Sequence, residues 1–338
     1  TGGTDTGLRI LKHSPSVYLA AETGGKNATI VTDMADRDQA IKNVLHSAFN
    51  NCGQKCSATS LLILEKSIYD DLHFRQQLVD AAASINVGPA WQLENKLAAL
   101  VREPDGALLR GLTTLEPGEE WALQPRMAGD NPHIWSPGIK YGVQPGSFTH
   151  LAELFGPVLG VMRAESLDEA IGLVNQTGYG LTSGLESLDE REQKIWKAGI
   201  KAGNLYINRG TTGAIVLRQP FGGMGKSALG PGLKAGSLEY VTQFMQITEV
   251  SPPKVEEIAG DHRLLQLAQE WRIMLAWGKW PLLAGEIEQT CYAITSYLSQ
   301  MAAQYGRELD YFHLRGQDNV LRYLPVKNLV IRLHQDDS

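Results

Sequence analysis

The chain has 338 residues, of which 43% are hydrophobic and 20% charged, so it is long enough to bury one or two ordinary cores. Its net charge of -6 argues against a nucleic-acid or anionic-membrane partner, because those surfaces need a basic footprint. The sequence contains no run of about 18 uninterrupted apolar residues, so we expect no membrane-spanning helix.

The first residues, Thr1 to Asp5, contain neither an initiator methionine nor a basic, apolar signal segment. We therefore expect the chain to be the middle of a longer protein. Its three cysteines, Cys52, Cys56 and Cys291, are odd in number and form no CxxC pair. This pattern favours a reducing compartment such as the cytoplasm, where a lone thiol is either a buried small hydrophobe or a nucleophile.

The first half of the chain alternates between helical patterns and short apolar runs. A glycine turn at Thr1 leads into a helix-like pattern up to Leu11, and Ile41 to Phe49 has helical spacing. Four apolar runs predict buried strands: Ser16 to Ala21, Ala28 to Val31, Leu61 to Leu64 and Val158 to Met162. This alternation indicates an α/β domain with a largely parallel sheet.

Two later regions have a different composition. Prolines and glycines become frequent from Leu100 to Phe148, which we interpret as surface excursions with antiparallel pieces. A linker is predicted at Ser251 to Lys254. Beyond it the pattern predicts helices over Leu264 to Trp277 and Glu286 to Tyr305, then strands around Leu309 to Leu314 and Asn328 to Leu333, with a turn at Gly316 to Asn319.

Cys56 is a candidate nucleophile. It follows a glycine turn and has Lys55 beside it, which offers a route to a lowered pKa. A single cysteine is more often inert packing, however, and Cys52 competes for the role. Spacing alone does not separate the two thiols.

Three further side chains could serve a cofactor or a reaction. Glu22 follows an apolar run and precedes two glycines, so it could project into a cleft as a general base, although a solvated loop glutamate is the commoner case. Glu153 and Phe155 would point the same way on an extended segment and could grip the sugar and ring of a nucleotide. The alternative is the start of a strand with one charged and one packing residue.

Two glycine-rich stretches, Gly210 to Ala214 and Gln219 to Ser227, suggest a loop folded against a ligand. They do not have the spacing of a P-loop. The eight histidines are scattered without the spacing of a metal site, so we predict no metal and interpret each one as a surface or packing residue.

The order of these motifs resembles that of the aldehyde dehydrogenase superfamily. The series is Thr-Gly-Gly-Thr at Thr1, Glu-Thr-Gly-Gly-Lys at Glu22, Gly-Gln-Lys-Cys ending at Cys56, Glu-Leu-Phe-Gly-Pro-Val at Glu153 and Pro-Phe-Gly-Gly at Pro220. The likeness runs from Thr1 to about Thr248. It implies an α/β fold with the catalytic domain of that family.

The resemblance also implies a mechanism. Cys56 would be the nucleophile, because the family's nucleophile follows Gly-Gln-x, and Cys52 would not. The aldehyde would form a thiohemiacetal on Cys56 and pass a hydride to NAD, and Glu22 would activate the water that hydrolyses the thioester. The backbone N–H of Cys56 would form part of the oxyanion site.

The cofactor residues follow from the same resemblance. Glu153 and Phe155 match residues that hold the nicotinamide ribose and pack near the ring, and Gly2 matches the turn that meets the pyrophosphate. Gly3 stands where many relatives have a serine. The family's oxyanion asparagine and adenosine-binding strands would lie before Thr1.

Within the superfamily, the sequence is most similar to the 1-pyrroline-5-carboxylate dehydrogenases, also called glutamate semialdehyde dehydrogenases. Ser57 follows the nucleophile, and Gly213 and Ala214 precede the second glycine stretch. In that family these residues hold the α-carboxylate of the substrate, largely through backbone amides, and Phe221 would pack on its carbon chain.

The tail from Arg315 to Pro325 resembles the extension of bifunctional proline-utilisation proteins, which fuse an FAD-dependent proline dehydrogenase upstream. We therefore divide the chain into a remnant of the NAD-binding domain (1–22), a catalytic domain with the end of a cofactor and oligomerisation segment (23–250), and a C-terminal α+β extension (251–338). The expected partners are a small-molecule aldehyde substrate, a fused proline dehydrogenase domain and further copies of the same chain in a homo-oligomer. The alternatives are an aldehyde dehydrogenase of another substrate class and a non-catalytic assembly module.

Overall fold

The computed structural model describes residues 1–248, 261–326 and 328–331. The chain forms two compact units, Thr1–Gln243 and Phe244–Ser338. The predicted linker at Ser251 to Lys254 lies outside the described residues. Within the described part of the chain, no helix is long and apolar enough to cross a membrane.

The first unit is built on a seven-stranded sheet. Its strands, in spatial order, are β4 (Glu120–Leu123), β5 (Gly138–Tyr141), β6 (Val158–Ala164), β3 (Thr59–Glu65), β2 (Asn27–Val31), β8 (Thr182–Glu186) and β9 (Asn204–Ile207). Every neighbouring pair is parallel except β4 and β5. The predicted parallel sheet is therefore confirmed, as is an antiparallel piece between residues 100 and 148.

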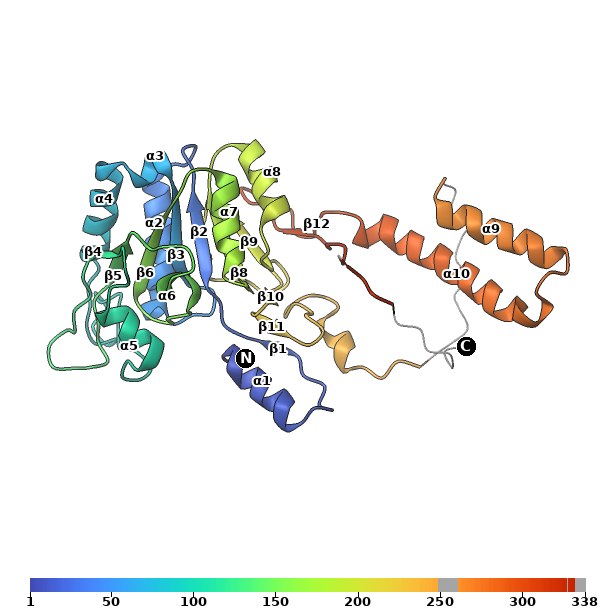
Figure 1. Cartoon of the computed structure of the whole chain (residues 1–338), viewed down its shortest axis with the longest axis horizontal. Coiled ribbons are helices and arrows are strands. Elements are labelled where there is room, and N and C mark those ends of the chain that lie inside the picture. The colour runs from blue at the N-terminus through green and yellow to red at the C-terminus, as the bar shows by residue number, and fades with distance from the viewer. Residues whose placement is uncertain (249–260, 327, 332–338) are drawn as a thin grey trace. The chain divides into compact units, whose positions relative to one another are not determined.

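Helices cover both faces of this sheet (Figure 1). One side carries α2 (Arg37–Phe49), α3 (Lys66–Tyr69) and α4 (Leu72–Ala83), and the other α7 (Leu167–Gln176) and α8 (Glu190–Gly199). On β3, Leu62 and Leu64 pack with the first group, and Leu61 and Ile63 pack with the second. Strands covered on both faces read as continuous apolar runs, which is why the sequence revealed them.

Shorter elements surround the sheet: α1 (Thr4–His13), β1 (Ala21–Glu22), η1 (Asn50–Gly53), α5 (Gly106–Thr113), α6 (Phe148–Leu151), β7 (Tyr179–Gly180), β10 (Met224–Gly225), β11 (Ala228–Leu229) and η2 (Tyr240–Phe244). The predicted buried strand at Ser16 to Ala21 is wrong. Only Ala21 belongs to a strand, and Val17 and Tyr18 are 42% and 63% exposed. Among the described residues, β1 pairs only with β11, so the run before Ala21 has no strand beside it to bury it.

The second unit contains two long helices and a small hairpin. These are α9 (Arg263–Ala276), η3 (Pro281–Leu283), α10 (Ala284–Gln300), the π-helical η4 (Met301–Tyr305), β12 (Leu309–Asp310) and β13 (Val320–Leu321). Both predicted helices are confirmed, and Cys291 is buried with its Sγ 3.6 Å from the carbonyl oxygen of Ala268. The strand predicted from Asn328 to Leu333 does not form over residues 328–331, and β12 pairs with the nearer β13 instead. Residues 332 and 333 lie outside the described part of the chain.

Candidate active site

Of the two competing cysteines, Cys52 lies within a tight turn after α2 and Cys56 follows that turn. Asn51, Cys52 and Gly53 all have positive φ angles, 54°, 57° and 67°. Only glycine fits at position 53, because a side chain there would collide with the backbone carbonyl of Gly156. The turn buries Cys52 in the core, with Sγ 3.0 Å from the Ala98 carbonyl oxygen, and leaves Cys56 partly buried.

The backbone of Cys56 is tied to strand β2. The side-chain amide of Asn27 donates hydrogen bonds to the carbonyl oxygens of Cys56 (2.6 Å) and Ala58 (2.9 Å). Gly25 lies so close that an added Cβ would come within 2.8 Å of the Cys56 carbonyl oxygen. The position of the thiol therefore depends on the start of strand β2, five residues after Glu22.

Burial raises the pKa of the Cys56 thiol, and the negative charge of Glu153 raises it further. Hydrogen bonds from the backbone amides of Cys56 and Ser57 oppose this effect, and the charge of Glu22 adds a smaller increase. The expectation of a lowered pKa for Cys56 is wrong, because burial and the nearby carboxylates raise it.

Glu22 is half-buried on β1, and its carboxylate meets the second glycine-rich stretch. Its Oε2 accepts a hydrogen bond of 3.0 Å from the backbone N–H of Gly223. Burial raises the pKa of Glu22, whereas the Gly223 amide and the charge of Lys234 oppose the increase. Gly2, predicted to meet a pyrophosphate, donates its N–H to the Glu22 carbonyl oxygen at 3.3 Å.

Glu153 and Phe155 are not on an extended segment, so the predicted i, i+2 geometry is wrong. Phe155 has a φ of 55°, which breaks the alternation of an extended chain. The Oε1 of Glu153 accepts a 2.8 Å hydrogen bond from the backbone N–H of Gly25, and Phe155 is 43% exposed. Both still line one small pocket, together with Gly25, Gly53, Lys55, Ala58, Thr59, Ser60 and Gly156.

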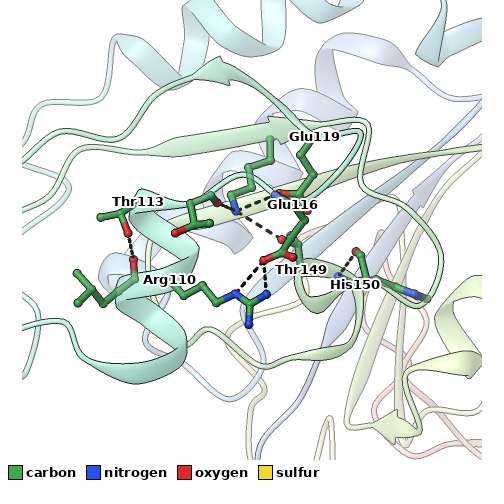
Figure 2. Close-up of polar contacts among 10 residues, drawn as sticks. Arg110, Thr113, Glu116, Glu119, Thr149 and His150 are labelled. Carbon is green, nitrogen blue, oxygen red and sulfur yellow. Dashed lines mark hydrogen bonds and ion pairs between the residues drawn. The ribbon is translucent and has the colours of Figure 1, made fainter.

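A buried polar network fixes helix α6, which ends two residues before Glu153 (Figure 2). The Lys140 ammonium group pairs with Glu119 at 3.1 Å and donates to the Thr149 hydroxyl at 3.4 Å. His150 is fully buried; its Nδ1 accepts from Gly146 N–H, and its Nε2 lies 2.9 Å from the Leu173 carbonyl oxygen. Burial lowers the pKa of His150, and this pairing fits the neutral ring with the proton on Nε2. Glu153 thus follows a firmly anchored turn.

The predicted substrate residues differ in how deeply they are buried. Ser57 is buried, and its carbonyl oxygen accepts a 2.9 Å hydrogen bond from the Thr211 hydroxyl. Gly213 has a φ of 87°, and it and Ala214 are exposed. Phe221 is half-buried and exchanges backbone hydrogen bonds with Ala235. The structure therefore brings Ser57 to the base of the glycine-rich loop.

Sequence reasoning missed three residues that position the site: Asn27, Thr211 and Lys234. Asn27 offered a signal, because an amide that opens a buried apolar strand must find hydrogen-bond partners. The other two make contacts with residues distant in sequence and left no local signal. Among the described residues, no group of three or more His, Cys, Asp or Glu side chains could hold a metal ion.

The chain is similar to several known proteins. An aldehyde dehydrogenase family model matches residues 1–250. The 1-pyrroline-5-carboxylate dehydrogenase of Geobacillus thermodenitrificans is 34% identical over 262 residues, which cover 74% of this chain and 50% of the relative. That of Oceanobacillus iheyensis is 32% identical over 260 residues, with the same coverage. The chain spans about half the length of the curated relatives it matches.

Two solved structures are also similar. Proline utilization A from Corynebacterium freiburgense is 42% identical with a TM-score of 0.84, over 96% of this chain and 32% of that one. A 1-pyrroline-5-carboxylate dehydrogenase from Thermus, solved with bound NAD, is 32% identical with a TM-score of 0.65, over 72% of this chain and 48% of that one. The predicted family and fold are confirmed: the chain belongs to the aldehyde dehydrogenase family.

Proposed function

We propose that this chain is the catalytic half of a longer NAD-dependent enzyme that oxidises glutamate semialdehyde, the open form of 1-pyrroline-5-carboxylate, to glutamate in proline catabolism. The observation that supports this best is the tight turn after α2, which buries Cys52 in the core but leaves the Cys56 thiol partly accessible on a backbone that Asn27 holds. The names of the relatives supply the substrate.

In the proposed reaction the Cys56 thiol first gives its proton to solvent. Its sulfur then attacks the aldehyde carbon, so a C–S bond forms and the carbonyl oxygen becomes an oxyanion. The backbone N–H of Cys56 donates a hydrogen bond to that oxygen. Conversion of the thiohemiacetal to a thioester requires a hydride acceptor, which bound NAD would supply. Glu22 then takes a proton from water, the hydroxide attacks the thioester carbon, and the C–S bond breaks to release the carboxylate and the thiol.

The described residues fit the nicotinamide end of NAD. Glu153 offers a carboxylate to ribose hydroxyls, and Phe155 offers an exposed ring beside the same pocket. Gly2 stands just before α1, where backbone amides could meet a phosphate. We place the adenosine-binding strands and the oxyanion asparagine in the part of the longer protein that precedes Thr1, and we propose that the chain alone is inactive.

Substrate choice is proposed to depend on a carboxylate site made by Ser57, Gly213 and Ala214. A glycine with positive φ can turn successive amides toward one anion, which makes a binding nest. Phe221 would pack on the carbon chain of the substrate. This arrangement distinguishes an aldehyde that carries an α-carboxylate from a plain aliphatic one.

The likeness to proline utilization A supports further proposals about the longer protein. It would carry an FAD-dependent proline dehydrogenase upstream, it would form a homo-oligomer, and its free cysteines would suit the cytoplasm. An aldehyde dehydrogenase of another substrate class is the main alternative. A non-catalytic module is disfavoured because Cys56 and Glu22 are both present.

The test is to express the longer protein and follow NADH formation with glutamate semialdehyde and with simple aliphatic aldehydes. We expect kcat/KM to be at least tenfold higher for glutamate semialdehyde, since a site that hydrogen-bonds one group of its substrate discriminates against an analogue without that group. Equal values would favour another substrate class, and no NADH from any aldehyde would favour the non-catalytic module.

A further inference from the structure

Lys234 uses its whole ammonium group to hold backbone near the proposed base. It belongs to the segment between Gly230 and Gly236 and is partly buried. Its Nζ donates hydrogen bonds to the carbonyl oxygens of Gly203 (2.6 Å) and Gly222 (2.8 Å), and to the side-chain oxygen of Asn204 (3.1 Å). Three acceptors match the three protons of the charged form.

Asn204 completes a clamp on the same loop. Its side-chain oxygen also accepts from the backbone N–H of Gly222 (3.1 Å), and its amide donates to the carbonyl oxygen of Pro220 (2.9 Å). The backbone from Pro220 to Gly223 is thus held by Lys234 and Asn204. The next amide along, that of Gly223, is the one that donates to the Oε2 of Glu22.

Lys234 also acts on Glu22 by its charge. Burial lowers the pKa of Lys234 to about 8, and the Glu22 carboxylate opposes that decrease. The positive charge of Lys234 in turn lowers the pKa of Glu22, against the larger effect of burial. The other group that interacts with Glu22 is the thiol of Cys56. In the 338-residue chain the amine of Thr1 adds a smaller positive charge, which would be absent from the longer protein.

We propose that Lys234 is a positioning residue for the base: it holds the Gly222–Gly223 peptide so that the Gly223 N–H stays on the Glu22 carboxylate, and it places a positive charge near that carboxylate. The inference rests on the proposed function, because it assigns Glu22 the role of base. It concerns a lysine that has no direct hydrogen bond to Glu22 among those described, so its influence passes through one peptide and through space.

The first experiment compares kcat against pH in the longer protein for wild type, Lys234→Met, Lys234→Gln and Lys234→Arg. Met and Gln remove the charge, and Gln keeps two donors. We expect the acid limb of the kcat profile to move to higher pH in both neutral variants, with kcat at pH 6 roughly tenfold lower and KM little changed. Lys234→Arg should restore part of the loss, and Lys194→Met, an exposed lysine on α8, should match wild type.

The second experiment needs no activity. In the 338-residue chain with carboxyl-labelled glutamate, the Glu22 signal is assigned by its loss in Glu22→Gln and titrated by NMR. The titration should move to higher pH in Lys234→Gln. Unchanged Glu22 titration and an unchanged acid limb, or a loss confined to KM, would overturn the proposal. A wild-type protein that oxidises no aldehyde would refute the proposed function instead, and the titration would still decide whether Lys234 controls Glu22.

Discussion

The two sides of the candidate site differ in how firmly they are held. On the nucleophile side, Asn27 bonds the carbonyl oxygens around Cys56, and any side chain at Gly25 would collide with that loop. On the substrate side, a Cβ at Gly213 would meet no atom within 4 Å, and Val216 is 73% exposed. In this chain the backbone around the proposed nucleophile is fixed to strand β2, whereas Gly213, proposed for substrate selection, lies on an open loop. A change at Gly213 can therefore alter substrate preference without disturbing the thiol.

The largest effect expected from this comparison is at Cys56. Cys56→Ser in the longer protein should lower aldehyde oxidation by several orders of magnitude, because it removes the covalent route. Cys52→Ser is the matched control: it should keep the rate and cost about 1 kcal/mol of stability, since it places a hydroxyl in the core. Steady-state kinetics and thermal unfolding measure both. An inactive Cys52→Ser beside an active Cys56→Ser would reverse the assignment of the nucleophile.

The next largest effect concerns the activity of the 338-residue chain by itself. We expect the 338-residue chain to be catalytically silent although it holds Cys56 and Glu22, because a dinucleotide lies across the ends of several strands of a doubly wound sheet. Loss of an oxyanion donor alone costs roughly a hundredfold in rate or more. Calorimetric titration with NAD should show no binding in the micromolar range. A micromolar Kd, or steady NADH formation, would show a more complete cofactor site.

The contrast between the two sides also explains which features could be predicted from the sequence. Strands β2, β3 and β6 are covered on both faces, so their apolar runs are continuous and visible. The order of the motifs around Glu22, Cys56 and Glu153 was enough to name the family. Such features can be predicted from the sequence because burial and turn formation depend on residues that are close together along the chain.

Long-range features could not be predicted. The run from Ser16 to Ala20 is apolar enough for a strand, but a strand also needs a neighbour, and pairing depends on distant residues. The backbone of Phe155 takes a positive φ that aromatic residues rarely adopt. The pKa of Cys56 is set by burial and by Glu153, which is 97 residues away along the chain and therefore invisible from Lys55 alone.

A smaller, selective effect is expected on the open side. Gly213→Val should raise KM for glutamate semialdehyde by roughly tenfold and leave KM for a short aldehyde without a carboxylate nearly unchanged, because a β-branched residue disfavours the positive φ that would turn the amides toward the carboxylate. Gly129→Val is a matched control, since Gly129 also has positive φ (62°) and open space around it. Equal losses on both substrates in Gly213→Val, or the same selectivity change in Gly129→Val, would remove the carboxylate-site idea.

The smallest expected effect is on stability. It tests a chain of hydrogen bonds that runs from Glu186 through α2 to the open loop. Both carboxylate oxygens of the buried Glu186 accept from the Asn43 side-chain amide, at 3.0 and 3.2 Å. One turn later in α2, the Ser47 hydroxyl donates to the Asn43 carbonyl oxygen and accepts from the backbone N–H of Thr211, at the base of the open loop. Glu186 thus supports the helix segment to which the substrate side is attached.

Burial raises the pKa of Glu186 from 4.5 to about 8. Because the folded state then holds this proton more tightly than the unfolded state, the stabilisation from protonated Glu186 is fully present below about pH 4.5 and is lost as the pH rises through about 8. Glu186→Gln, which stays neutral, should therefore lose less stability between pH 5 and pH 8 than wild type, by about 2 °C in Tm or more. Calorimetry at both pH values measures the difference, with the exposed Glu94→Gln as control. If the Tm of wild type and that of Glu186→Gln change equally between the two pH values, Glu186 is ionised in the folded protein. The hydrogen bonds from Asn43 then stabilise a buried carboxylate instead of a neutral acid.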